Sequence, residues 1–302
     1  MPLTLDIDRG RKAAEALVRA FATTGIHGRK DMPEDVLPAG VVKGSLEHLL
    51  FLTLTVSIDY QRYADALWKS SRRTYEDPRT RYLFDPGALS ASAPDVVARD
   101  MQQHSLAKKP RKDPWIWRTI GVTFHKKWGG DPRRFLADCG WSAQEVLERL
   151  RDDRHLSGAR QVPDYPYLRG PKIGTVWVRI LRDNAGMTDL VDLEKVPIPV
   201  DVHIARATLR LGVVRGNYSG SLSGLFEHIR QAWSSSVRGL SCGDRAMVAL
   251  DVDEPLWHLS KYGCATWHGV TGKCLQSSTC EVRGLCVDGI VRIGRSKAEV
   301  ST

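Results

Sequence analysis

The segment from Leu168 to Gly212 constrains the fold of this chain more than any other part of the sequence. It opens with LRGPKIGTV, a turn that contains Gly170 and Gly174 and leads into apolar residues at helical spacing. It closes with IPVDVHIARATLRLG, in which Asp201 follows a proline and precedes a second helical pattern that ends at a glycine. The segment therefore predicts a hairpin between two helices, followed by a further helix with an acid at its start.

The turn is of a kind that binds phosphate. Glycine readily adopts positive φ angles, so Gly170 and Gly174 would let backbone N–H groups approach a ligand closely. A helix that starts at or just inside this turn presents unpaired N–H groups, which attract a phosphate without reading base sequence. The alternative is an ordinary tight turn between two packed helices.

Asp201 has two compatible roles. As the N-cap of the helix that follows it, its side chain accepts a hydrogen bond from an N–H group of the first turn. The positive end of the helix also keeps the carboxylate ionised near neutral pH, which suits stabilising a cation that develops on a sugar. The apolar residues Ile198, Val200 and Ile204 would strengthen this field by excluding water.

The charge of the chain favours a polyanionic partner. Its 302 residues carry a net charge of +9 with a pI near 9.3, and DNA is the obvious polyanion. Asp6 and Asp8 lie where a signal peptide would need apolar residues. The longest apolar stretch, around Leu49 to Ile58, is too short to span a bilayer. We expect a cytoplasmic monomer that does not bind membranes.

The two motifs resemble the helix-hairpin-helix DNA glycosylases, the superfamily of endonuclease III and of the adenine and 8-oxoguanine glycosylases. The family has a hairpin of the type L-P-G-V-G-x-K-T-A, then a V-D-x-H segment with an arginine three residues after the histidine. In this chain the matching residues are Leu168, Gly170, Thr175, Val200, Asp201, His203 and Arg206.

The resemblance implies an all-α fold of two helical lobes with a cleft between them. A six-helix barrel-like lobe that ends in the hairpin is placed at residues 46–185, and the second lobe at residues 1–45 plus 186–302. Double-stranded DNA would lie across the cleft with one modified or damaged base flipped inward. Its N-glycosidic bond would be hydrolysed while Asp201 stabilises an oxocarbenium-like state. The implied DNA contacts are Gly170, Lys172, Gly174, Thr175, Gln61 and Arg206, of which Gln61 would fill the gap left by the base or simply link two helices.

The hairpin departs from the family pattern at two positions. Gly174 stands where members with lyase activity carry the Schiff-base lysine, and Lys172 replaces the second hairpin glycine. Because a lysine nucleophile must reach the sugar as a neutral amine, this displacement favours a monofunctional glycosylase. The alternatives are a bifunctional glycosylase and AP lyase that uses Lys172, a non-catalytic DNA-binding module, and a defence glycosylase that acts on modified phage DNA.

Four cysteines near the C-terminus form the pattern C-x9-C-x5-C-x5-C: Cys264, Cys274, Cys280 and Cys286. Four thiolates can bind a [4Fe–4S] cluster or a tetrahedral zinc ion. Zinc sites usually contain short C-x2-4-C pairs, which are absent here, so an iron–sulfur cluster is favoured. Many members of the family that this chain resembles carry a four-cysteine cluster after the acid segment, with the spacing C-x6-C-x2-C-x5-C. Only the last interval of that spacing matches this chain.

The rest of the chain reads as helices and loops. The pattern predicts a helix over Arg11–Thr24, a buried helix capped by Ser45, and short helices with prolines near their starts over residues 63–150. Residues Arg215–Gly224 are predicted to be a loop. The segment Lys108-Lys109-Pro110-Arg111-Lys112 has four positive charges in five residues and would contact DNA phosphates or form a solvated loop.

Overall fold

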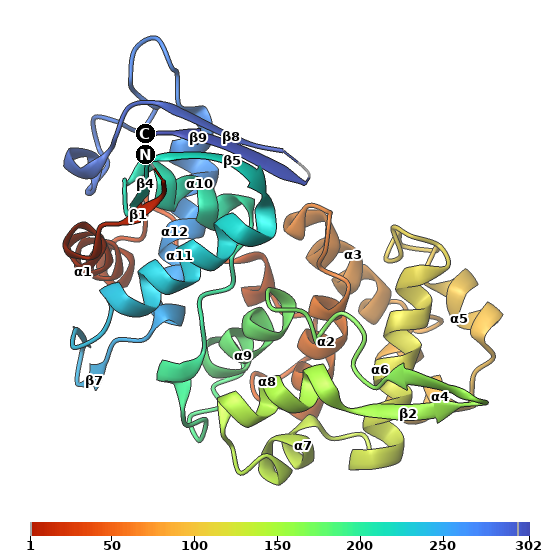
Figure 1. Cartoon of the computed structure of the whole chain (residues 1–302). Coiled ribbons are helices and arrows are strands. Elements are labelled where there is room, and N and C mark those ends of the chain that lie inside the picture. Colours follow the sequence, from red (N-terminus) through yellow and green to blue (C-terminus); the bar gives the residue numbers. More distant parts are fainter. Residues whose placement is uncertain (1, 295) are drawn as a thin grey trace. The chain divides into compact units, whose positions relative to one another are not determined.

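The fold is mostly helical, as the sequence predicted. The computed structural model describes residues 2–294 and 296–302, and these contain twelve α-helices and nine short strands (Figure 1). The chain divides into two compact units. We call Met32–Leu193 the hairpin unit and Met1–Asp31 with Glu194–Thr302 the terminal unit.

The hairpin unit begins at Met32, well before its first α-helix. Two polar contacts hold this early segment within the unit. Glu34, which is 3% exposed, forms an ion pair with the buried guanidinium of Arg179. The neighbouring Asp35 accepts a hydrogen bond from the Asn184 side chain at 2.6 Å. These contacts hold the segment before the first helix of the hairpin unit against the end of its last helix.

The hairpin unit is built on helix α2 (Leu46–Ser57), which is buried on nearly all sides as predicted. Ser45 caps this helix by accepting a hydrogen bond from the backbone N–H of His48 at 3.2 Å. Large aromatic side chains such as Phe51, Trp117 and Trp177 fill the core around it. The other helices are α3 (Ala64–Glu76), α4 (Pro86–Ala91), α5 (Pro94–Asp100), α6 (Lys112–Trp128), α7 (Pro132–Asp138), α8 (Ala143–Asp152) and α9 (Ile173–Asp183).

Prolines start three of these helices, as predicted. Helices α4, α5 and α7 begin at Pro86, Pro94 and Pro132. The ring fixes φ near the helical value, and the missing N–H is one that a first turn leaves unpaired in any case. Pro114 instead lies inside the first turn of α6.

A two-stranded hairpin, β2 (Arg154–Ser157) with β3 (Arg160–Pro163), was not predicted. It connects α8 to the glycine-containing turn. Asp164 anchors its base, because this fully buried carboxylate contacts Lys127 Nζ at 2.5 Å and His155 Nδ1 at 2.6 Å. None of its strand residues is fully buried, so no apolar alternation marked it in the sequence.

The terminal unit has its own core, formed mainly by α1 (Ile7–Thr23), α10 (Val202–Arg210), α11 (Leu222–Ser236) and α12 (Asp253–His258). Helix α1 packs against α11 at Gly10, where a Cβ atom would lie only 2.0 Å from Ser236 Oγ. The glycine therefore sets how closely these two helices approach.

A three-stranded antiparallel sheet was also missed. Its order is β5 (Asn217–Ser221), β9 (Lys297–Ser301), β8 (Ile290–Ile293) (Figure 1). The prediction of a loop over Arg215–Gly224 was therefore wrong. None of the residues of β5 is fully buried, so no buried apolar residues marked this strand in the sequence. The central strand β9 alternates, with Ala298 and Val300 buried. The remaining strands form two pairs, β1 (Thr4–Leu5) with β4 (Val214–Arg215) and β6 (Ser241–Cys242) with β7 (Arg245–Ala246).

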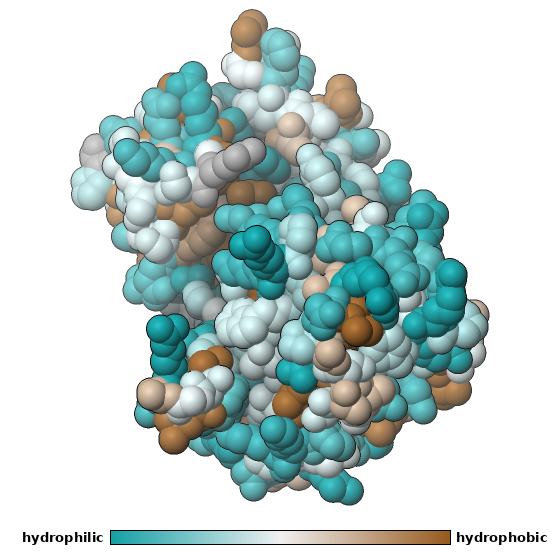
Figure 2. Space-filling model, turned by 90° about the vertical axis from the view of Figure 1, so that its right-hand side faces the viewer, coloured by the Kyte–Doolittle hydropathy of each residue, from teal (hydrophilic) through white to brown (hydrophobic). Residues whose placement is uncertain are grey.

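Within the described residues, none of the helices combines the length and apolar character needed to cross a bilayer. In Figure 2, hydrophilic residues cover much of the face shown.

Candidate functional site

The glycine-containing turn leads directly into α9, as predicted. Lys172 is the residue before its first turn, and the Gly174 N–H already donates to Gly170 O at 2.9 Å. The expected backbone conformation of the two glycines was wrong, however, because neither Gly170 nor Gly174 has a positive φ angle. The residue with positive φ is Tyr167, at 68°. Gly170 instead donates its N–H to Tyr167 O at 3.0 Å, which closes the turn.

Gly174 is required for close packing. A Cβ atom at this position would lie 2.6 Å from the backbone oxygen of Leu168 and 3.1 Å from Leu147 Cδ2. A backbone carbonyl cannot move aside as a flexible side chain can, so any side chain here would distort the turn. Thr175 lies beside it, and its hydroxyl donates to Pro171 O and Lys172 O, both at 2.9 Å.

Lys172 is joined to the end of α2. Its Nζ lies 3.3 Å from Asp59 Oδ2 and 3.4 Å from Asp59 O. Asp59 is thus the carboxylate partner of the Lys172 ammonium group. It also connects the turn to the loop that carries Gln61.

Gln61 is exposed and has a positive φ angle of 53°. Two lysines hold it in this conformation: Lys108 Nζ donates to Gln61 O, and Lys109 Nζ donates to Gln61 Oε1, both at 2.8 Å. Gln61 and the turn therefore belong to one connected part of the hairpin unit.

Asp201 is the N-cap of α10, as predicted. Its Oδ1 accepts hydrogen bonds from His203 N at 2.8 Å and Ile204 N at 3.0 Å. Both bonds use the same oxygen, and among the described residues Oδ2 has no hydrogen-bond partner. The flanking apolar residues Val200 and Ile204 are buried in the core of the terminal unit. One carboxylate oxygen thus fixes the side chain to the first turn of α10.

A residue that the sequence did not indicate connects two members of the Asp201 segment. Ser260 is fully buried, and its Oγ accepts a hydrogen bond from Arg206 Nη1 at 3.2 Å and lies 3.4 Å from His203 Nδ1. It belongs to a π-helical turn, Leu259–Gly263, that follows α12 and directly precedes Cys264. Such turns interrupt α-helices rarely and are frequent at functional sites. No local sequence signal marks Ser260, because its partners are more than fifty residues away.

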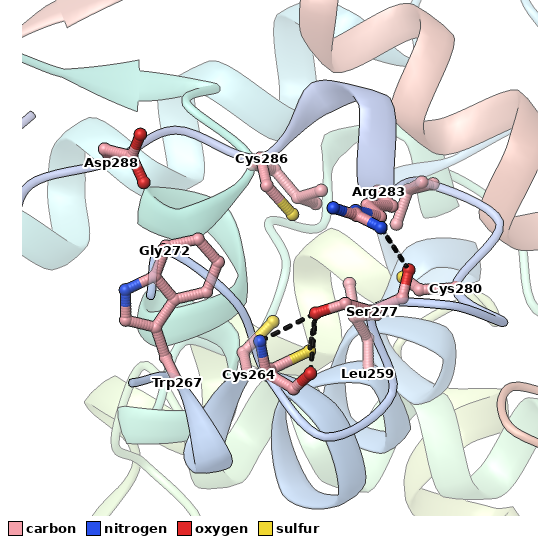
Figure 3. A pocket seen from close by; sticks show the side chains of 12 residues that line it. Leu259, Cys264, Trp267, Gly272, Ser277, Cys280, Arg283, Cys286 and Asp288 are labelled. Atoms are coloured by element: carbon pink, nitrogen blue, oxygen red, sulfur yellow. Dashed lines mark hydrogen bonds between the residues drawn. The ribbon is translucent and has the colours of Figure 1, made fainter. Parts of the chain in front are cut away.

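The four C-terminal cysteines lie around one cavity of about 160 Å³ in the terminal unit. Figure 3 shows Cys264, Cys280 and Cys286 on its wall together with Trp267 and Arg283. The other lining residues are Cys274, Leu211, Leu259, Gly272, Ser277, Val282 and Asp288. All four cysteines carry free thiols.

A single zinc ion and an iron–sulfur cluster require different spacings of the sulfurs. Zn–S bonds of about 2.3 Å would hold four sulfurs within about 4 Å of one another. Among the described residues, no three His, Cys, Asp or Glu side chains are close enough to bind one metal ion. All four cysteines line this one cavity.

The electrostatics of the cavity disfavour bare thiolates. Burial, and then repulsion from the neighbouring cysteines, raises the pKa of the Cys264 thiol. Burial also raises the pKa of Cys280 to about 11 and, to a smaller extent, that of Cys286. Four ionised sulfurs would therefore need a positive group in the cavity. Arg210 supplies part of that charge, because it interacts electrostatically with Cys264 and Cys286. Its guanidinium lies 4.4 Å from the centre of the Trp267 ring.

The turn, the capped Asp201 and the cysteine segment follow one another in this order along the chain. Two solved structures of endonuclease III are similar to this chain. One is a trapped covalent intermediate with DNA that contains an estranged adenine, with a TM-score of 0.50; the other is a non-covalent complex with DNA, with a TM-score of 0.51. Each is 14% identical to this chain, and the match covers 94% of this chain and 96% of the other.

The chain therefore has the fold of endonuclease III, which confirms the resemblance found in the sequence at the level of the fold. No protein-family model matches the chain. A search of curated proteins likewise found no match.

Proposed function

We propose that this protein is a DNA glycosylase that hydrolyses the N-glycosidic bond of a modified or damaged nucleotide. Two observations support a DNA substrate: the fold is that of endonuclease III, whose similar structures are complexes with DNA, and the net charge is +9. The observation that carries the catalytic role is Asp201, which is fixed through Oδ1 and has Oδ2 available.

Asp201 would act as an electrostatic stabiliser. The bond between the base nitrogen and the sugar C1′ breaks, and its electron pair leaves with the base, so that positive charge develops on the sugar. A carboxylate beside this charge stabilises the transition state more than the ground state. Water then forms the new bond to C1′ and loses a proton, and the base is released in protonated form. The nucleotide must be flipped out of the duplex first.

Two contacts favour a monofunctional enzyme. A side chain at Gly174, where lyase-competent members of the resembling family carry the lysine, would collide with Leu168 O. Lys172 is ion-paired with Asp59, so its amine would have to leave this carboxylate before it could act as a nucleophile. We infer that Lys172 contributes to binding and that no Schiff base forms.

We further propose that the turn and the first turn of α9 bind a DNA phosphate, through Gly170, Lys172, Gly174 and Thr175. The N–H groups of Gly170 and Gly174 already donate within the turn, so the glycines would shape the site. The partial positive charge of the helix start and the ammonium group of Lys172 would attract the phosphate. Gln61 would occupy the space left in the duplex by the flipped base, since its loop is held by two lysines close to the turn. Arg206 would contact DNA from the terminal unit. The substrate implies a cytoplasmic protein, which we expect to act as a monomer.

The cysteine cavity is proposed to hold a [4Fe–4S] cluster. In such a cluster each thiolate binds a different iron, so the sulfurs lie farther apart than around a single ion. The proposal is supported by four cysteines that line a common cavity: Cys264, Cys274, Cys280 and Cys286. The positive irons would offset the burial and mutual repulsion that raise the thiol pKa values. The cluster would stabilise this loop-rich segment and take no part in bond cleavage.

The test is the release of free base. The protein is incubated with duplex DNA that carries a panel of damaged bases and of modified bases of the phage type, and liberated bases are identified by mass spectrometry. Strand breaks are scored with and without alkali. We expect one class of base to be released, with breaks only after alkali.

Other outcomes separate the alternatives. Alkali-independent breaks, together with borohydride trapping that Lys172→Ala abolishes, would identify a lyase. Salt-sensitive DNA binding without release of any base would identify a binding module. For the cluster, anaerobically purified protein should contain about four irons and four sulfides per chain, and Cys280→Ser should lose them. Zinc in their place would refute the cluster.

A further inference from the structure

A cluster of lysines and tyrosines lies beside the turn in the hairpin unit, formed by Tyr60, Lys108, Lys109, Lys112 and Tyr167. We call it the lysine–tyrosine cluster. The Tyr60 and Tyr167 rings stack with centres 4.2 Å apart. Lys109 Nζ lies 4.0 Å from the centre of the Tyr60 ring, and Lys112 Nζ lies 4.6 Å from that of Tyr167. The cations are thus held over aromatic faces.

One buried carboxylate, Asp113, organises this cluster without neutralising the lysines. It accepts hydrogen bonds from Tyr60 Oη at 2.5 Å and from the backbone N–H groups of Lys108 and Lys109 at 2.8 and 2.9 Å. These bonds fix the backbone of the loop at Lys108 and Lys109 and the position of the Tyr60 ring. The carboxylate therefore contacts the backbone of the lysine loop and leaves the ammonium groups outward.

The ammonium groups of Lys108, Lys109 and Lys112 form no ion pair with a carboxylate in the part of the chain that the structure describes. Two of them donate to oxygens of Gln61, and the π faces supply only partial negative charge. Such partners determine where a cation lies and leave most of its charge available to an anion. In an ordinary solvated loop, by contrast, lysines would be free to move.

The cluster is continuous with the turn proposed to bind phosphate. Tyr167 accepts the hydrogen bond that closes the turn, from Gly170 N at 3.0 Å. Tyr60 follows Asp59, which is paired with Lys172. Because the tyrosine rings stack on each other, the lysines and the turn are held on one rigid support. An anion that extends beyond the turn on the side of Tyr167 would approach Lys112, whose Nζ lies over that ring.

We propose that the lysine–tyrosine cluster binds the phosphate backbone of DNA next to the phosphate bound by the turn. The proposal rests on the proposed function for its partner, and it assigns the lysine-rich segment a DNA contact in place of the solvated loop. Trp115 lies one turn after Lys112 on α6 and is 44% exposed. Aromatic surface between cations is a common feature of nucleic-acid-binding sites.

The experiment measures the salt dependence of binding to duplex DNA for the full chain. Lys109→Gln with Lys112→Gln removes two cations from the cluster. The matched control is Lys43→Gln with Lys126→Gln, two exposed lysines of the same unit. Lys126 lies about 21 Å from Lys112 along α6, as fourteen residues rise about 1.5 Å each. Lys43 precedes α2, whereas the cluster lies at its end.

Each phosphate contact contributes about 0.9 to the slope of log K against log salt concentration. We expect the Lys109 and Lys112 pair to lower the magnitude of this slope by about 1.8 and to weaken binding equally for all sequences, whereas the control pair leaves the slope unchanged. An unchanged slope for the cluster variant, with salt-sensitive binding by the wild type, would overturn the proposal and leave the proposed function intact. Absence of DNA binding by the wild type would instead refute the proposed function.

Discussion

Asp201 offers a test that separates its structural role from its chemical role. Its Oδ1 caps α10 with hydrogen bonds of 2.8 and 3.0 Å to His203 N and Ile204 N. Asparagine caps helices about as well as aspartate but carries no charge, whereas alanine has no side-chain acceptor. Asp201→Asn therefore removes the charge and keeps the cap, and Asp201→Ala removes both.

The expected magnitudes differ for the two measurements. Loss of the cap in Asp201→Ala should lower the free energy of unfolding by about 1 kcal/mol, within a range of about 0.5–2 kcal/mol. Asp201→Asn should lower it by less than about 1 kcal/mol, through the lost interaction with the helix dipole. Both variants should slow base release by about 100- to 1000-fold, because each removes a preorganised electrostatic group, an effect of about 2.7–4 kcal/mol on the barrier.

The assays are urea unfolding and single-turnover base release at saturating enzyme, with DNA binding measured in parallel. Base release by Asp201→Asn within threefold of the wild type would show that the charge does not stabilise the transition state. A loss of stability in Asp201→Asn as large as that in Asp201→Ala would show that the cap depends on the charge.

Three further predictions concern stability. Glu34→Gln should lower the free energy of unfolding by about 3 kcal/mol in urea, because Arg179 is buried and loses a carboxylate; a loss below about 1 kcal/mol would contradict this. Burial lowers the pKa values of His48 and His258 to about 4, from 6.5 when unfolded, so stability should be complete above about pH 6.5 and decrease as the pH falls toward 4. Urea titrations across this range check that prediction, and a doubly substituted His48→Gln, His258→Gln variant with an unchanged acid dependence would refute it. Ser260→Ala should cost about 1 kcal/mol of stability and weaken DNA binding, since its hydroxyl accepts a hydrogen bond from the arginine of the Asp201 segment; unaltered binding would rule out the second effect.

The predictions that succeeded depend on neighbours in the sequence. The cap of α10 by Asp201 and the start of α2 after Ser45 involve bonds between residues two or three positions apart. The proline starts of α4, α5 and α7 follow from the geometry of one ring. Such features are fixed by local chemistry, so composition and spacing are enough to find them.

The role of the turn glycines shows where local reasoning stops. A glycine favours positive φ, and the sequence suggested this at Gly170 and Gly174, but the structure has positive φ at Tyr167 instead. Gly174 is needed because the carbonyl of Leu168 approaches it, which depends on how α9 packs against the preceding segment. The missed strand β5 was hidden for a similar reason, since its partner β9 lies at the other end of the unit's sequence.

The sequence by itself determined the order of helices, the capping acid and the candidate cysteines, because each is encoded within a few residues. Only the tertiary structure joined Tyr60 to Tyr167, Ser260 to Arg206, and four cysteines to one cavity. These contacts connect residues far apart in the chain, and the packing of buried helices and loops decides which of them meet. A single sequence carries the donors and acceptors of such contacts but not their pairing.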